Sequence, residues 1–94
     1  MKSNILGSYL KKKRIEADMS QAEVAKLLGY GTSQYISNFE RGACAPSLKI
    51  LNKLSKAFKV DIREFFDIVM EQRRADVKQV LFAPKRGRRA GRAS

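Results

Sequence analysis

A stretch of uncharged polar side chains lies inside an otherwise basic sequence. Residues 30–39 carry no charge, although the 94-residue chain has 20 Lys and Arg against 9 Asp and Glu, a formal charge of +11. Gln34 and Asn38 are four residues apart, which places their amides on one face of a helix. An amide can pair with adenine, and the hydroxyls of Ser33 and Ser37 can serve either type of base. The segment therefore offers hydrogen-bonding groups suited to base edges.

The net charge indicates a polyanionic partner. An isoelectric point near 10.2 favours nucleic acid, with an anionic membrane surface as the second possibility. Histidine is absent and Cys44 is the single cysteine, which excludes an internal disulfide, the common zinc sites and Cys/His nucleophiles. We therefore expect no catalytic residue, no metal and no cofactor, and no small-molecule ligand is evident.

Length and hydropathy favour a cytoplasmic protein with a single small folded domain. The chain is long enough for one core and a tail, and its hydrophobic fraction of 44% is ordinary for a folded protein. No apolar run approaches the roughly 18 residues that span a bilayer. The N-terminus also has no apolar signal region. We expect a cytoplasmic, nucleoid-associated protein without a membrane partner.

Five helices are predicted to position the polar segment. The first spans about 4–17. The pair Ser20 and Glu23 has the spacing of a capping box that begins the second helix, and Gly29 suits the left-handed residue that ends it. The third helix, about 32–41, carries the amides and hydroxyls. Its expected N-cap is Thr32 or Ser33.

The apolar pattern continues through two further helices. The third helix buries Ile36 and Phe39 and ends at Gly42, Ser47 caps a fourth, and Asp61 caps a fifth. The residues expected to face inward from the fourth helix are Leu48, Leu51, Leu54 and Phe58. These features predict an all-α fold.

Three parts of the chain are distinguished by their composition: a domain over 3–68, a helical extension over 69–83, and a basic tail over 84–94. In the extension, Val69, Val77 and Val80 have no obvious partner within a five-helix core, so this segment is either a dimer contact or a loosely docked helix. Pro84 should end the helix. The tail has no apolar anchor, which favours disorder in the free protein.

A long run of residues carries the pattern of a known family. The run comprises Arg14, Met19-Ser20-Gln21-Ala22-Glu23-Val24-Ala25, Leu28-Gly29, Ile36-Ser37-Asn38-Phe39-Glu40-Arg41-Gly42 and Pro46-Ser47-Leu48. It resembles the Xre/Cro phage-repressor family of helix-turn-helix proteins, from about Leu6 to Phe66. The resemblance implies a third helix that lies in the major groove of double-stranded DNA. Gly29 to Glu40 is one residue longer than the commonest form, which leaves the register of the first recognition residues open by one position.

The resemblance also implies roles for individual residues. Base contacts would come from Ser33, Gln34, Ser37 and Asn38, and phosphate contacts from Gln21, Thr32, Tyr35, Arg41 and Lys49. Arg14 and Glu40 would form a structural ion pair that orients the recognition helix. Two alternatives stay open: Tyr35 either packs on the turn or reaches phosphate, and Lys11–Lys13 either reach phosphate or form a solvated face.

The tail offers a second DNA contact. Its sequence Pro84-Lys85-Arg86-Gly87-Arg88 resembles the core of an AT-hook, in which Arg-Gly-Arg lies along a narrow A·T-rich minor groove. Arg89 stands where the motif expects a second proline, and a general phosphate-binding arm is the alternative. Minor-groove or phosphate contacts are therefore predicted for Lys85, Arg86, Arg88 and Arg89.

These features together predict a sequence-specific transcriptional regulator, a repressor, that binds a palindromic operator as a homodimer. One alternative is a nucleoid-associated architectural protein that binds DNA mainly through its basic tail. Another is that the amphipathic segment 62–82 contacts a membrane or a partner protein.

Overall fold

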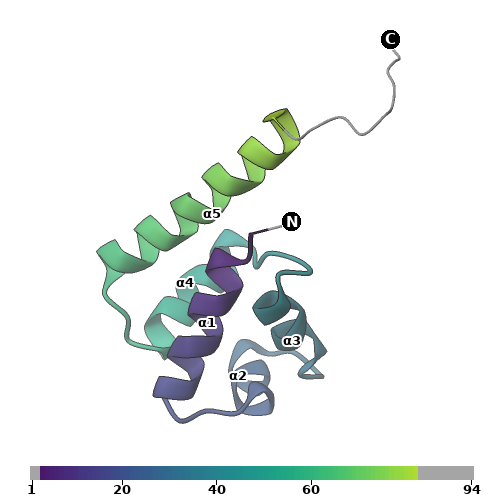
Figure 1. Ribbon diagram of the computed structural model, residues 1–94. Helices are drawn as coiled ribbons and strands as arrows, with labels where there is room; N and C mark the ends of the chain where they lie inside the picture. Colours follow the sequence, from purple (N-terminus) through teal and green to yellow (C-terminus); the bar gives the residue numbers. More distant parts are fainter. Residues whose placement is uncertain (1–2, 83–94) are drawn as a thin grey trace.

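The computed structural model describes residues 3–82 of the chain, and within this range it contains five helices and no strand (Figure 1). The helices are α1 (Ile5–Glu16), α2 (Gln21–Leu28), α3 (Gln34–Arg41), α4 (Leu48–Ala57) and α5 (Ile62–Phe82). The first four form a bundle, while α5 lies along one side of it and projects beyond it. The predicted all-α fold of five helices is confirmed.

Local capping signals set the helix boundaries on both sides of α2. Ser20 Oγ accepts from the Glu23 backbone N–H at 3.0 Å, and the Glu23 carboxylate accepts from the Ser20 N–H at 2.7 Å. The predicted capping box is thus complete. Gly29 then adopts φ +83°, the left-handed conformation expected at this C-cap.

The later helices begin at the predicted polar residues. Ser33 occupies the N-cap position of α3 without a side-chain capping bond, whereas the Thr32 hydroxyl accepts from the Gln34 N–H at 3.2 Å. Ser47 caps α4 through its hydroxyl, and the Asp61 carboxylate accepts from two backbone N–H groups at the start of α5. Since each of these bonds spans two or three residues, the sequence alone could specify them.

The hydrophobic core is built around α1 and contains side chains from all five helices: Leu6, Tyr9, Leu10, Val24, Ala25, Leu28, Ile36, Phe39, Leu51, Leu54 and Phe65. Ile36 and Phe39 are the predicted buried pair of α3. The prediction that Leu48 faces inward is wrong, because its side chain is 81% exposed. Leu48 is the first residue of α4 and lies one turn before Leu51, where the core begins.

The beginning of α5 is docked on α1. Phe65 enters the core, with its ring centroid 5.9 Å from that of Tyr9. The Tyr9 hydroxyl donates to Glu64 Oε1 at 2.9 Å. Burial raises the pKa of Tyr9, and the hydrogen bond to Glu64 raises it further, so the hydroxyl stays protonated and able to donate. The prediction that Val69 has no partner is wrong, because its side chain packs, partly buried, against the core. After Asp76, every described residue of α5 is exposed.

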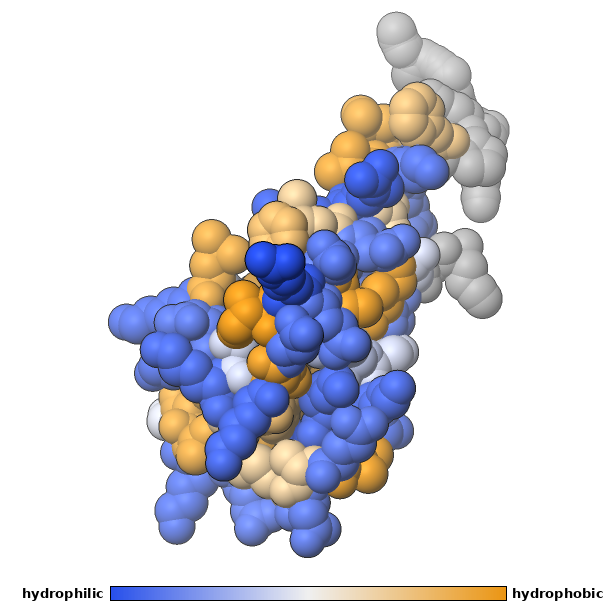
Figure 2. Space-filling model, turned by 90° about the vertical axis from the view of Figure 1, so that its left-hand side faces the viewer, coloured by the Kyte–Doolittle hydropathy of each residue, from blue (hydrophilic) through white to orange (hydrophobic). Residues whose placement is uncertain are grey.

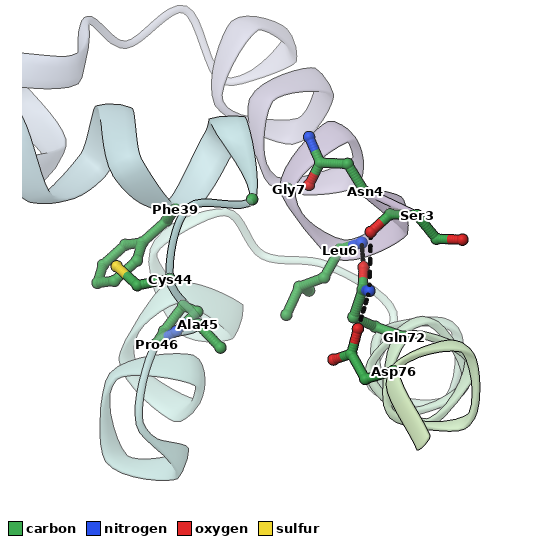
Figure 3. Close-up of a pocket in the computed structure, with 11 residues that line it drawn as sticks. Ser3, Asn4, Leu6, Gly7, Phe39, Cys44, Ala45, Pro46, Gln72 and Asp76 are labelled. Atoms are coloured by element: carbon green, nitrogen blue, oxygen red, sulfur yellow. Dashed lines mark hydrogen bonds between the residues drawn. The ribbon is translucent and has the colours of Figure 1, made fainter. Parts of the chain in front are cut away.

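Hydrogen bonds of Gln72 join the middle of α5 to the N-terminal end of α1 (Figure 3). Its Oε1 accepts from the Leu6 backbone N–H at 2.8 Å, and its Nε2 donates to the Ser3 carbonyl at 3.1 Å and to Asp76 Oδ1 at 2.9 Å. The first N–H groups of a helix have no partner within that helix. Gln72 therefore supplies from α5 a cap that the sequence next to α1 does not provide.

The same end of α1 lies against the end of α3. The Asn4 amide donates to the Glu40 carbonyl at 2.9 Å. A Cβ on Gly7 would lie 2.6 Å from the carbonyl oxygens of both Phe39 and Glu40, so only glycine permits this approach. A cavity of about 90 Å³ remains between these helices and α5. Contacts through α1 thus connect α5 with the predicted recognition helix.

The proposed division of the chain can be compared with the helix limits. The boundary between 68 and 69 falls inside α5, which is continuous from Ile62 to Phe82. The predicted stop at Pro84 and the tail 84–94 lie outside the described residues. Among residues 3–82, no helix is long and apolar enough to cross a membrane.

Candidate nucleic-acid interface

The turn between α2 and α3 is braced by aromatic rings. The ring of Tyr30 stacks on that of Tyr35, with centroids 4.5 Å apart and an interplanar angle of 21°. The centroid of the Tyr30 ring also lies 6.3 Å from that of Phe39. The Tyr30 N–H also donates to the Ala25 carbonyl at 2.9 Å. The Tyr35 ring therefore packs on the turn, as one of its two interpretations expected. The sequence offered no sign of the role of Tyr30.

The exposed face of α3 carries a chain of side-chain hydrogen bonds. Gln34 Nε2 donates to Asn38 Oδ1 at 3.0 Å, and Arg41 Nη2 donates to the same oxygen. The two amides predicted to contact bases thus lie together, and Arg41, predicted to contact phosphate, lies beside them. Ser33 at the N-cap and Ser37 and Asn38 on the helix are half-buried, whereas Gln34 and Arg41 are exposed. The i, i+3 spacing of Asn38 and Arg41 could have revealed their contact.

Arg14 and Glu40 form the ion pair that the family resemblance implied. Arg14 Nε lies 2.6 Å from Glu40 Oε2, and Nη2 donates to Oε1 at 3.2 Å, which makes the contact bidentate. Arg14 Nη1 also donates to the Met19 carbonyl at 2.8 Å. Only 7% of Glu40 is exposed. The buried carboxylate therefore ties α1 to the end of α3.

Gln21 has a role in this cluster that the sequence interpretation missed. Its Nε2 donates to Glu40 Oε1 at 3.0 Å, so α2 joins the same carboxylate. An amide nitrogen carries two hydrogens, and this bond uses one of them. The other hydrogen remains for a phosphate oxygen, at the positive N-terminal end of α2. The predicted phosphate contact and the observed contact are compatible.

The other lysines predicted to contact phosphate lie on α1 and α4. Lys49 is exposed at the start of α4, and Lys11 and Lys12 are exposed on α1. Lys13 instead bonds Glu16 at 3.3 Å, and this hydrogen bond raises the pKa of Lys13. Lys13 Nζ also lies 3.6 Å from Glu64 Oε1. Lys13 is therefore half-buried and paired with carboxylates of its own chain, which neither of the two interpretations of Lys11–Lys13 expected.

Three other predictions concern sites away from α3. Cys44 is exposed in the loop before α4 and is free. Residues 3–82 contain no group of His, Cys, Asp and Glu side chains that could hold a metal ion. The tail residues Lys85, Arg86, Arg88 and Arg89 lie outside the described residues.

Two short helices joined by a glycine turn, with an exposed polar face on the second, define a helix-turn-helix domain. The helix-turn-helix family model HTH_3 matches residues 10–65, more than half of the chain, and the protein belongs to this family. The predicted family resemblance is confirmed. The family consists of non-enzymatic DNA-binding regulators, which agrees with the prediction that the protein is not an enzyme.

Two relatives are similar to the domain part of the chain. One is the cryptic phage CTXphi transcriptional repressor RstR of Vibrio cholerae, 35% identical over 60 residues that cover 64% of this chain and 53% of the relative. The other is the ImmF control region 10 kDa protein of Bacillus phage phi105, 37% identical over 57 residues that cover 61% of this chain and 62% of the relative. The chain thus matches less than two thirds of the length of each relative.

Proposed function

We propose that the protein is a transcriptional repressor that binds operator DNA in a sequence-specific manner, with α3 in the major groove. The observation that carries this proposal is the outer face of α3, where the exposed Gln34 and the half-buried Asn38 offer uncharged amides. Cations bind phosphate with little regard to sequence, whereas amides and hydroxyls distinguish base edges. The similarity to a phage transcriptional repressor supports the regulatory role.

Each predicted site residue has a place in this proposal. Base contacts come from Ser33, Gln34, Ser37 and Asn38, and phosphate contacts from Gln21, Thr32, Tyr35, Arg41 and Lys49. The ion pair of Arg14 and Glu40 orients α3. Lys85, Arg86, Arg88 and Arg89 add minor-groove or phosphate contacts from the tail. The protein acts with the DNA in the cytoplasm.

A homodimer formed through α5 is part of the same proposal. Seven large apolar side chains of α5 are exposed, and five of them form a stripe: Ile62, Phe66, Met70, Val77 and Val80. At 3.6 residues per turn these five lie within a sector of about 80°, which also contains Arg73, away from the side that carries Phe65 and Gln72. Figure 2 shows hydrophobic side chains gathered where α5 projects beyond the bundle. Pairing with a second copy removes this stripe from water.

The end of α5 also needs packing for its own stability. The helical segment from Val77 to Phe82 has no buried residue in its own chain. Short helical segments in water are marginal without a packed face. A second α5 supplies that face, and two-fold symmetry then directs two recognition helices to half-sites about 34 Å apart. The operator is accordingly palindromic.

Selection of binding sites from a random DNA pool tests the proposal. We expect one enriched palindromic sequence, bound at least about 1,000-fold more tightly than random DNA at the same salt concentration. Equal affinity for selected and random DNA would contradict sequence-specific repression and support the architectural alternative, which depends mainly on the net charge of +11. A reporter gene that carries the selected site upstream then checks whether transcription falls.

A further inference from the structure

Arg41 sets the orientation of the side-chain amides of Asn38 and Gln34 on α3, that is, which way the oxygen and the nitrogen of each amide point. Asn38 Oδ1 accepts hydrogen bonds from Arg41 Nη2 and from Gln34 Nε2. A guanidinium group has only donors, so the atom of Asn38 that faces Arg41 must be the oxygen. The Asn38 nitrogen therefore points the other way. The orientation of this amide follows from the chemistry of its partner.

The orientation of Gln34 follows in the same way. The Gln34 atom that faces Asn38 Oδ1 must be a donor, so it is the nitrogen. The Gln34 oxygen is left with both of its lone pairs unused by the described side chains. A single cation at the end of α3 thus sets the direction of the whole chain of hydrogen bonds.

We propose that Arg41 is a positioning residue that makes Asn38 a donor and Gln34 an acceptor toward the bases, an inference that rests on the proposed function. Bidentate pairing with adenine needs an amide oxygen that accepts and an amide nitrogen that donates. Both lone pairs of Asn38 Oδ1 are already taken. Asn38 therefore cannot make the bidentate pair with adenine. It donates to the acceptors that guanine, thymine and adenine present, and it discriminates against cytosine, whose major-groove edge carries only an amine.

Gln34 has the complementary preference. Its free oxygen accepts from an exocyclic amine, which adenine and cytosine present in the major groove, and its nitrogen keeps one hydrogen that can donate to adenine N7. The two amides, although similar in chemistry, thus read different kinds of base. Without Arg41, the Asn38 amide can turn over and pair with adenine. The inference therefore predicts a change of base preference, and not only of affinity.

A phosphate contact by Arg41 would have a different signature. Loss of one phosphate contact lowers the affinity for all sequences about equally and reduces the salt slope of binding by about 1. It leaves the base preference at each position unchanged. The two roles are therefore separated by the sequence profile that a variant selects.

The experiment is selection from a random DNA pool with the full chain and four variants. The wild type should disfavour cytosine by about fivefold or more, without a preference for adenine, at the Asn38 position of each half-site. Arg41→Leu should gain a preference for adenine, whereas Arg41→Lys, which has only donors, should keep the wild-type profile. Lys49→Leu is the control, because it removes an exposed cation elsewhere and should weaken binding without altering the profile.

Asn38→Asp provides an independent readout. An aspartate still accepts from Arg41 and Gln34 but has no N–H to donate, so the selected base should change to one with an exocyclic amine, such as cytosine. The same profile for Arg41→Leu as for the wild type, or the same base for Asn38→Asp, would overturn the inference and leave the proposed function standing. A wild-type chain that selects no sequence would overturn both.

Discussion

Glu40 is the residue on which three helices converge. Its buried carboxylate accepts from Arg14 of α1 and from Gln21 of α2. Replacement of Arg14 by alanine leaves a buried charge with one weaker partner, which costs about 3–5 kcal/mol. We expect Arg14→Ala to lower the free energy of unfolding by this amount, as measured by urea denaturation at neutral pH.

Lys12→Ala is the matched control for this variant. Lys12 is an exposed cation on the same helix, so its loss should change stability by less than about 0.5 kcal/mol. The double variant Arg14→Ala/Glu40→Gln should recover part of the loss, because a neutral amide costs less to bury than a carboxylate. Wild-type stability in Arg14→Ala would show that the ion pair does not fix α3.

Tyr35 allows packing and DNA contact to be separated at a single side chain. Tyr35→Phe keeps the ring on Tyr30 and removes the hydroxyl proposed to reach phosphate. It should retain stability and lose affinity for DNA, whereas Tyr35→Ala should also lose about 0.5–1.5 kcal/mol of stability. Thermal denaturation and DNA titration at fixed salt measure the two effects. Unchanged affinity in Tyr35→Phe would leave packing as the role of this residue.

At the scale of elements, Gln72 holds α5 against α1. Gln72→Ala leaves the Leu6 N–H without its acceptor and should destabilise the protein by about 1–2 kcal/mol. Hydrogen exchange should rise most in α5 after position 72, because this part has few other contacts. Gln79→Ala, an exposed amide on the same helix, is the control. Equal exchange in the two variants would contradict the docking role of Gln72.

The limits of prediction from sequence also differ by element. The capping bonds of α2 and the left-handed Gly29 were predictable, because each depends on residues close together in the chain. Asn4 and Glu40 are 36 positions apart, and Leu6 and Gln72 are 66 apart, so no local pattern reveals these contacts. Periodicity identifies which face of a helix is buried. It does not show at which residue along the helix the core ends, and this explains the error at Leu48.

For the interface, the types of residue were predictable from sequence but their connections were not. The spacing of Gln34 and Asn38 placed both amides on one face, and the structure agrees. The bond from Gln21 to Glu40 depends on how α2 packs against α3, which only the folded chain defines. The stacking of Tyr30 depends likewise on the shape of the turn between α2 and α3.

At the scale of the whole molecule, the homodimer proposed above would be joined through the projecting end of α5. Val80 is 80% exposed and has no role in the core of its own chain. Val80→Glu should therefore leave the monomer folded but disrupt pairing, because it places a carboxylate inside an apolar contact. Gln79→Glu adds the same charge at the adjacent position, off the stripe, and should leave pairing intact.

Light scattering and DNA titration together test this pairing. The wild type and Gln79→Glu should have about twice the chain mass of 10.6 kDa, and Val80→Glu the single mass. Because a dimer binds its second half-site at high effective concentration, Val80→Glu should weaken binding to a palindrome about 100-fold. Binding to one isolated half-site should stay unchanged. A monomeric wild type, or a Val80→Glu variant that remains dimeric, would show that this face of α5 does not join two copies.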